Sequence, residues 1–312
     1  MSTPMANYTV GEILRETRER KKCSQEEVCY GICTPSTLSR IENGMQIPGR
    51  RILEALTQRL GITDNLYTTY MGREELELYE TGKRLMRSLG HGDYKELELL
   101  VHQLEQMLER IERRDYNVHM EEQYILFAKA ILQKHRGTER QKVLEMMLEA
   151  VRITIPDFDG VHVKNRCLTF QEITILNNIS CIYHEMGKVL EAFRIIIVLK
   201  EYMEEHVMDE EEKAKKYPMI IQNMVSWLSQ EGRYEDALVL CESGLECCIE
   251  YGKMKVFPML LYNKSALLAE TGQLDKSRKC FLQTIAIFQA MNQHRQAEDI
   301  RSYANRDYKL NL

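Results

Sequence analysis

The sequence contains few residues that interrupt helices and no segment apolar enough to cross a membrane. Only six prolines and sixteen glycines occur in 312 residues, while strong helix formers such as Ala, Leu, Glu and Lys fill long stretches. The longest uncharged apolar run, Ile195–Leu199, is far shorter than the roughly 18 residues that a membrane-spanning helix requires. The first residues lack the basic and apolar regions of a signal peptide. We therefore expect an all-α protein that remains in the cytoplasm, away from membranes.

The motifs of common enzymes and metal sites are also missing. There is no GxGxxG, no Walker loop, no GxSxG and no pair of catalytic carboxylates. The eight histidines show no metal-ligand spacing such as HExxH, and none of the nine cysteines belongs to a CxxC pair. In a reducing cytosol, scattered cysteines are typical small buried residues. We expect no enzymatic activity, no metal and no cofactor.

Charge is distributed unevenly along the chain. Residues 1–65 contain nine Lys and Arg against eight Asp and Glu, a net charge of +1, so the total of −5 leaves −6 for the remainder. An acidic remainder argues against nucleic-acid binding along the whole chain. Any bound nucleic acid should therefore contact the N-terminal part.

Helix-start signals divide the N-terminal part into four short helices. Two residue pairs have the spacing of a capping box, Thr9 with Glu12 and Ser24 with Glu27. Thr34 followed by Pro35 is typical of the N-cap and first turn of a third helix, which we expect to end at Gly44. Leu38 and Ile41 share one face of this helix, and Ser36, Thr37 and Arg40 share another. A fourth helix should end near Gly61 and turn its apolar residues inward.

Two short helices joined by a tight turn form the geometry that places one helix in the DNA major groove. The stretch SQEEVCYGICTPSTLSRIENG resembles the helix-turn-helix of the Cro/phage-repressor superfamily, and the resemblance covers residues 8–63. It implies phosphate contacts at either end of the motif and base contacts along the third helix. The implied DNA-binding residues are Gln25, Thr34, Pro35, Ser36, Thr37, Arg40 and Asn43. We expect Glu42 to be a structural partner, because DNA phosphates would repel its carboxylate.

The turn before the third helix is one residue shorter than in the commonest phage repressors, with Cys33 near the usual turn glycine. The sequence therefore leaves open which of Thr34, Pro35 and Ser36 faces the bases. It also leaves open a helical domain that uses this fold only for protein contacts.

Beyond Tyr67 the sequence repeats a helix–glycine–helix pattern. The glycines recur at spacings of 45, 50, 45 and 40 residues, at Gly92, Gly137, Gly187, Gly232 and Gly272. The segments MGKVLEAF, GRYEDALVL and TGQLDKSRKCF resemble the second half of tetratricopeptide repeats, although the period exceeds the usual value of about 34. The resemblance is good over residues 165–291 and weaker over 73–155. It implies a right-handed superhelix of helical hairpins whose first helices line a concave surface.

Three asparagines occupy one position in three of these repeats. Asn178, Asn223 and Asn263 each lie nine residues before the repeat glycine. Asparagine is a poor mid-helix residue because its amide competes for backbone hydrogen bonds. A ladder of carboxamides offers donors and acceptors to the backbone of an extended peptide, and in tetratricopeptide proteins this position faces the concave groove. Alternatively, the amides bond neighbouring helices and only fix their stacking.

The residues around these asparagines complete the expected peptide-binding surface. They are Thr174, Met219, Gln222, Ser226, Met259 and Tyr262. Methionine adapts well to a bound ligand, but methionine at helical spacing is also typical of a core.

The head and the repeats together resemble the peptide-pheromone-responsive regulators of Gram-positive bacteria, of the PlcR, PrgX and Rgg type. The resemblance implies a homodimer that binds a double-stranded DNA operator and changes its DNA binding when a short signalling peptide fills the groove. The expected domains are a helix-turn-helix domain at 1–66, a linker helix at 67–90 and a repeat domain at 91–312. The alternative function is a helical-repeat protein that binds and inhibits a protein partner. In a third hypothesis, the chain is a regulator that binds no peptide, and a protein partner occupies the groove instead.

Overall fold

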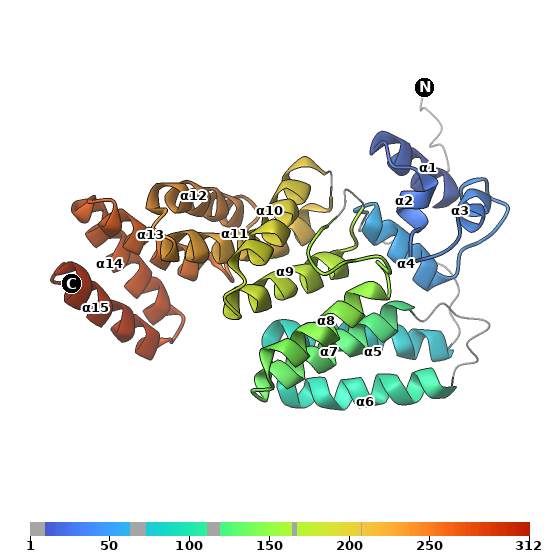
Figure 1. Ribbon diagram of the computed structural model, residues 1–312, viewed down its shortest axis with the longest axis horizontal. Coiled ribbons are helices and arrows are strands. Elements are labelled where there is room, and N and C mark those ends of the chain that lie inside the picture. The colour runs from blue at the N-terminus through green and yellow to red at the C-terminus, as the bar shows by residue number, and fades with distance from the viewer. Residues whose placement is uncertain (1–9, 63–72, 111–118, 164–166, 207) are drawn as a thin grey trace, which may run out of the picture. The chain divides into compact units, whose positions relative to one another are not determined.

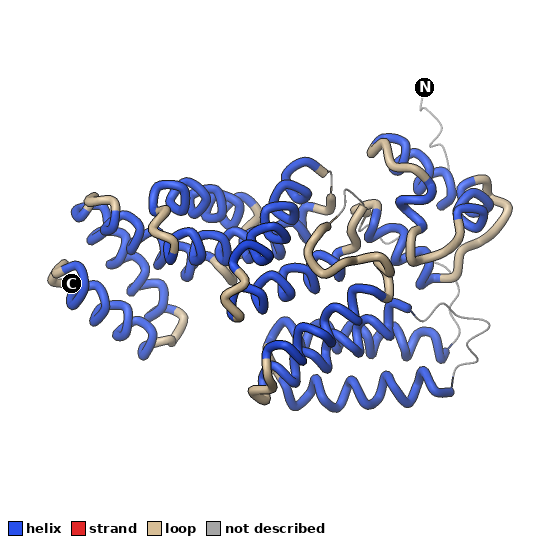
Figure 2. The backbone as a smooth tube through the Cα atoms, in the orientation of Figure 1, coloured by secondary structure: helices blue, strands red, loops and turns tan. Residues whose placement is uncertain are grey.

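The computed structural model describes residues 10–62, 73–110, 119–163, 167–206 and 208–312, and every regular element in these ranges is a helix (Figure 2). This confirms the all-α expectation. The chain divides into two compact units, the first made of residues 1–199 and 205–208, the second of residues 200–204 and 209–312. None of the described helices has the length and apolar character that a membrane crossing needs.

The first unit begins with four short helices, which we call the head (Figure 1). They are α1 (Val10–Arg20), α2 (Gln25–Cys29), α3 (Pro35–Glu42) and α4 (Arg50–Arg59). The predicted capping box is present at Ser24, whose hydroxyl accepts from the Glu27 backbone N–H while the Glu27 carboxylate accepts from the Ser24 N–H. The other predicted box includes Thr9 and falls outside the described residues. Leu14, Val28 and Leu56 are fully buried between the helices and form the core of the head.

Helical hairpins follow the head. The first unit contains α5 (Arg73–His91), α6 (Tyr94–Arg110), α7 (His119–His135), α8 (Arg140–Arg152) and α9 (Phe170–Glu185), and α10 (Val189–Glu205) begins there. The second unit contains α11 (Glu210–Gln230), α12 (Tyr234–Glu250), α13 (Phe257–Glu270), α14 (Leu274–Ala290) and α15 (His294–Tyr308). Within each unit, consecutive helices such as α7 and α8 or α13 and α14 pack against one another. The division into domains at 1–66, 67–90 and 91–312 stays a prediction.

The five repeat glycines occupy the predicted turns. Gly92, Gly137, Gly187, Gly232 and Gly272 each follow the first helix of a hairpin and have φ angles between +71° and +80°. Glycine adopts this left-handed conformation without the steric cost that a side chain adds, and there it ends a helix. The glycine spacing in the sequence therefore marks the tight turn of each hairpin.

Gly244 has a different role, because it lies inside α12 where three helices of the second unit meet. A Cβ atom at this position would lie 2.8 Å from Ile221 Cγ2 of α11 and 3.0 Å from Leu260 Cδ1 of α13. Both neighbours are fully buried, so neither can move aside at low cost. The missing side chain lets α12 approach both helices closely.

Gly244→Ala should therefore destabilise the protein. The overpacked methyl group should cost about 1–3 kcal/mol, only partly offset by the better helix propensity of alanine. The measurement is urea unfolding followed by far-UV circular dichroism. Gly90→Ala in α5 is the matched control, because a Cβ atom there meets nothing within 4 Å, and it should be neutral or slightly stabilising. Equal stability of the two variants would contradict close contact at Gly244.

Candidate nucleic-acid and ligand-binding surfaces

Helix α3 buries its apolar face in the head and leaves its polar face exposed. Thr34 caps the helix, since its hydroxyl accepts from the Thr37 backbone N–H at 3.2 Å, and Pro35 occupies the first turn, as predicted. Leu38 and Ile41 are buried in the core of the head. The exposed residues at the start and along the outer face of the helix are Thr34, Pro35, Ser36 and Arg40, and Thr37 is half-buried. A helix presented in this way can enter a groove without unfolding the head.

The start of α3 carries a small cluster of hydroxyl groups. Thr34 Oγ1 lies 2.9 Å from Ser36 Oγ and 2.8 Å from Thr37 Oγ1. Hydroxyl groups can donate to or accept from either base edges or phosphates. One turn further along, the exposed Arg40 guanidinium has the planar fork that matches the O6 and N7 atoms of guanine.

The predicted phosphate-contact residues are partly engaged within the head. Gln25 Nε2 donates to Glu42 Oε2 at 2.7 Å, and Arg18 donates to both carboxylate oxygens of Glu42, at 2.7 and 2.9 Å. The hydrogen bond to Glu42 raises the pKa of Arg18. Glu42 is therefore buried as a structural partner, as the sequence indicated. The exposed Asn43 caps the end of α3 and donates from Nδ2 to the Ser39 carbonyl at 2.8 Å.

Two exposed apolar side chains beyond α3 were not predicted. Met45 is 74% exposed and Ile47 is 82% exposed in the segment between α3 and α4. The signal in the sequence was the short apolar alternation in GMQIPG between two glycines. Both residues follow the end of α3 within five positions.

In the first unit, the predicted ligand residues Asn178 and Thr174 lie on α9 and are half-buried. Asn178 Nδ2 donates to the Thr174 carbonyl at 2.9 Å, and the Thr174 hydroxyl donates to the Phe170 carbonyl at 2.9 Å. The bond from Asn178 uses one of its two amide hydrogens within its own helix. Asn178 belongs to the first unit and the other two asparagines to the second, so the alignment of all three stays a prediction.

In the second unit, Asn223 and Asn263 lie on α11 and α13, which are in contact. Both asparagines are half-buried, as are Gln222 and Ser226. One turn before each asparagine lies an exposed methionine, Met219 at 43% and Met259 at 39% exposure. The repeated pair of a carboxamide and a flexible apolar side chain is therefore accessible to solvent on both helices.

Tyr262 has a more structural environment than the residues around it. Its ring centroid lies 6.3 Å from that of Phe281 and 6.0 Å from that of Tyr303. Burial raises the pKa of the Tyr262 phenol to about 12. Because the ring contacts aromatic side chains of α14 and α15, we infer that Tyr262 mainly packs these helices together.

The head contacts the hairpins of the first unit through a buried ion pair that the sequence did not reveal. Arg59 Nη2 of α4 lies 2.6 Å from Glu172 Oε1 of α9, and the two side chains are 2% and 0% exposed. Arg59 also donates to the Tyr30 carbonyl. Glu172 completes a capping box at the start of α9, because its carboxylate accepts from the Thr169 backbone N–H at 2.6 Å. The pair therefore ties the end of α4 to the first turn of α9.

A second ion pair lies between α4 and α7. Arg51 Nε is 3.0 Å from Glu121 Oε1, with each side chain 10% exposed. Burial raises the pKa of Glu121 to about 7; the charge of Arg51 opposes the shift, and Glu54 and Glu122 reinforce it. This carboxyl group therefore titrates near neutral pH.

The turn between α2 and α3 also rests on the hairpins. The Tyr30 hydroxyl donates to Asp157 Oδ1 at 2.7 Å. Gly31 has φ +69°, and a Cβ atom there would lie 2.1 Å from the Thr154 carbonyl oxygen. Gly31, two residues before Cys33, is thus a turn glycine of the motif at a position where no side chain fits.

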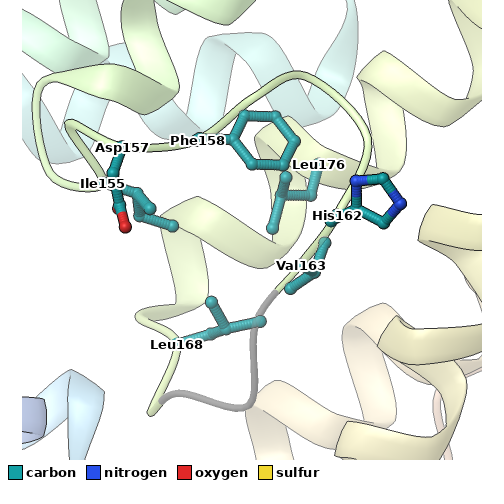
Figure 3. Close-up of a pocket in the computed structure, with 7 residues that line it drawn as sticks. All are labelled: Ile155, Asp157, Phe158, His162, Val163, Leu168 and Leu176. Carbon is teal, nitrogen blue, oxygen red and sulfur yellow. The ribbon is translucent and has the colours of Figure 1, made fainter.

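Residues 153–163, which follow α8, supply both of these contacts. Figure 3 shows Phe158, Val163 and Leu168 around Leu176 of α9, where they line a cavity of about 10 Å³. Such a volume holds about one water molecule, which excludes a ligand. The described residues that line this cavity therefore pack against α9.

The comparisons with known proteins agree with this architecture. Residues 9–67 match a family model described as a helix-turn-helix domain. The crystal structure of Bacillus thuringiensis PlcR in complex with the peptide PapR7 and DNA superposes with a TM-score of 0.59 and 17% identity, covering 93% of this chain and 98% of PlcR. This chain has the fold of PlcR.

Further structures give the range of similarity. The apo form of PlcR has a TM-score of 0.57 at 16% identity and covers 94% of this chain and 98% of its own. The apo form of the competence regulator ComR from Streptococcus vestibularis has a TM-score of 0.49 at 16% identity, covering 95% and 96%. No curated protein sequence matches the chain. In the described part of this PlcR-like chain, no group of three or more His, Cys, Asp or Glu side chains is arranged to hold a metal ion.

The raised pKa of Glu121 predicts a pH dependence of stability. Between the ordinary value of 4.5 and about 7, the native protein retains a proton that the unfolded chain has released. The unfolded chain binds fewer protons in this window, so stability should fall as pH rises from about 5 to 7, by up to roughly 3 kcal/mol.

Urea unfolding at a series of pH values checks this expectation, with Glu121→Gln as the reference. The unfolding free energy of Glu121→Gln is subtracted from that of wild type at each pH. The contribution of the histidines, which both proteins share, cancels in this difference. It should fall between pH 5 and 7 and level off above about pH 8. A difference that does not change with pH would show that Glu121 is already ionised in the native protein at pH 5.

Proposed function

We propose that this protein is a sequence-specific DNA-binding transcription regulator whose repeat hairpins sense a signalling peptide. It acts in the cytoplasm, where both the operator and an imported peptide are accessible. The observation that carries the proposal is the presentation of α3, with a buried apolar face and an exposed face that holds Ser36 and Arg40.

The DNA-binding part of the proposal rests on the head. The helix-turn-helix match covers residues 9–67, which include all seven of the expected DNA-binding residues. In a helix-turn-helix, the second of the two helices lies in the major groove, and residues near its start contact base edges. In this chain that helix is α3. The hydroxyl cluster at Thr34 and Ser36 lies at that start, and Arg40 follows one turn later. Gln25 and Asn43, at the two ends of the motif, are proposed to contact phosphates.

The peptide-sensing part rests on the hairpins. PlcR has the same fold, and its structure was determined with the peptide PapR7 and DNA. In this chain, Asn223 and Asn263 repeat on α11 and α13 with an exposed methionine beside each. Carboxamides can pair with any peptide backbone, while methionines adapt to different side chains. We therefore expect a short extended peptide rather than a folded partner.

Signal transfer in this proposal uses the contact between head and hairpins. The ion pairs Arg59–Glu172 and Arg51–Glu121 join α4 to α9 and α7, so a shift of these helices moves the head with them. One head has too little surface for tight operator binding. We propose a homodimer that reads two half-sites about 34 Å apart or a multiple of this, whose spacing the peptide adjusts.

Arg40→Ala should weaken DNA binding without affecting folding. Loss of a bidentate guanine contact typically costs about 1–3 kcal/mol, which corresponds to a loss of affinity of about fivefold to 150-fold. The wild-type protein first selects duplexes from a random library, and fluorescence anisotropy then gives the Kd of each variant for the enriched duplex. Arg233→Ala is the matched control. Arg233 is an exposed arginine just before α12, outside the head, and it pairs with Asp236 in the first turn of that helix. It should bind as wild type does.

Two results would contradict the DNA-binding proposal. One is a random library that yields no enriched sequence, and the other is an enriched duplex that Arg40→Ala binds as tightly as wild type. Either result would favour the alternative, in which the chain binds and inhibits a protein partner and uses the head only for protein contacts.

The double variant Asn223→Ala/Asn263→Ala should lose peptide binding and keep DNA binding. Selection from a library of random seven-residue peptides displayed on phage gives the probe peptide, and calorimetry gives its Kd. We expect a loss of at least tenfold, since two backbone-directed carboxamides are removed. Gln283→Ala/Gln289→Ala is the control, because it removes two exposed carboxamides from α14. If the asparagines only fix helix stacking, the double variant should instead lose thermal stability while its peptide Kd stays within about twofold of wild type.

A further inference from the structure

Two cysteines that are far apart in the sequence meet where the head contacts the hairpins. Cys23 Sγ lies 2.7 Å from Cys167 Sγ, although 144 positions separate the two residues, and both are free thiols. This distance is shorter than an ordinary non-bonded contact between sulfur atoms. The two sulfur atoms need to approach by less than about 1 Å to reach the length of a disulfide bond, about 2.05 Å.

We propose that Cys23 and Cys167 are a redox modification site, at which a peroxide forms a reversible disulfide that ties the head to the hairpins. The proposal adds a covalent link to the contact between head and hairpins. It does not depend on which DNA or peptide the protein binds.

Local structure holds both cysteines in place. Cys23 immediately precedes the capping box at Ser24, and its carbonyl accepts from Arg18 Nη1 at 3.1 Å. Cys167 lies two residues before Thr169, the N-cap of α9. Cys167 also belongs to the same buried cluster as the core of the head. Each thiol is therefore anchored by the start of a capped helix, and the pair cannot drift apart unless the contact between head and hairpins opens.

The two thiols differ in the way that stepwise oxidation requires. Cys23 is half-buried, and its pKa is lowered to about 7, first by the hydrogen bond with Cys167 and then by the charges of Lys21 and Arg18. Cys167 is buried, and the hydrogen bond to Cys23 together with burial raises its pKa well above the usual range. The half-buried Cys23 is thus the thiol that ionises first and acts as the nucleophile, and the buried Cys167 is the thiol beside it.

The oxidation is balanced with hydrogen peroxide as the two-electron oxidant. The Cys23 thiolate attacks one peroxide oxygen, the O–O bond breaks, and a sulfenic acid and hydroxide form. The Cys167 thiol then attacks the sulfenic sulfur, the S–S bond forms, and water leaves with the Cys167 proton. Overall, two thiols and one peroxide give one disulfide and two water molecules. A thiol reductant reverses the step by thiol–disulfide exchange.

The disulfide should be identified by mass spectrometry of the full-length protein. The reduced protein is treated with hydrogen peroxide, blocked with iodoacetamide, and digested with trypsin and a glutamate-specific protease without reductant. Cleavage before both cysteines and at the glutamates that follow separates Cys23 from Cys29 and Cys33, and Cys167 from Cys181. We expect the fragment that begins at Cys23 to be joined to the fragment that begins at Cys167, and dithiothreitol to separate them.

Single variants show whether the link is specific. Cys23→Ser and Cys167→Ser should each abolish the linked fragment, whereas Cys33→Ser in the head and Cys181→Ser in α9 should retain it. Far-UV circular dichroism checks the helix content of each variant, and Cys167→Ala serves as a second variant if Cys167→Ser unfolds. Thermal unfolding gives an independent readout, because a link across a long loop should raise the Tm of the oxidised protein by about 5 °C. Cys167→Ser should show no such rise.

Three results would overturn the proposal. In the first, both fragments are recovered as separate iodoacetamide adducts after peroxide treatment. In the second, dimedone traps Cys23 as a sulfenic acid that does not proceed to the linked fragment. In the third, the link joins two chains, which a non-reducing gel reveals as a dimer.

Discussion

The buried ion pair between Arg59 and Glu172 is the interaction on which the arrangement of the first unit depends. The two side chains are 2% and 0% exposed, so both charges have lost their water. A buried charge is tolerated only when a partner and hydrogen bonds replace the lost hydration, and removal of one partner leaves the other charge uncompensated. Here the backbone N–H of Thr169 and the carbonyl of Tyr30 supply such bonds. The orientation of the head is therefore fixed at a point where a small displacement is costly.

This anchoring explains why α3 remains available. The head contacts the hairpins through α4, the turn after α2 and Cys23, whereas the outer face of α3 is exposed. Gly31 permits the closest approach, since no Cβ atom fits against the Thr154 carbonyl. The same contact thus constrains the head and leaves Ser36 and Arg40 exposed. Rigidity and accessibility are compatible because they involve different faces of the head.

Local signals in the sequence predicted most of the fold, because they act within a few residues. The capping box at Ser24, the N-cap at Thr34 and the glycine turns depend on backbone groups nearby, so spacing alone indicates them. The contact between Arg59 and Glu172 bridges 113 positions and shows no local pattern. The partial burial of Tyr262 likewise depends on Phe281 and Tyr303, which come from other helices. The spacing of the asparagines predicted that each lies on the first helix of its hairpin. It did not predict their hydrogen-bond partners, such as the Thr174 carbonyl that accepts from Asn178.

The two ion pairs also limit how a ligand can regulate the head. A ligand shifts an equilibrium only by its difference in affinity for two states, which typically amounts to about 1–3 kcal/mol. Loss of one partner from a buried pair typically costs about 3–5 kcal/mol, and Arg59–Glu172 between α4 and α9 is such a pair. Arg51–Glu121 joins α4 to α7 through a carboxyl group whose pKa burial raises to about 7. A displacement that leaves either charge of Arg59–Glu172 buried without its partner therefore costs more than a coupling energy of this size supplies. In the proposed regulator, the head and its supporting helices must therefore move as one body, and the change in DNA affinity arises from the separation of the two heads in the dimer.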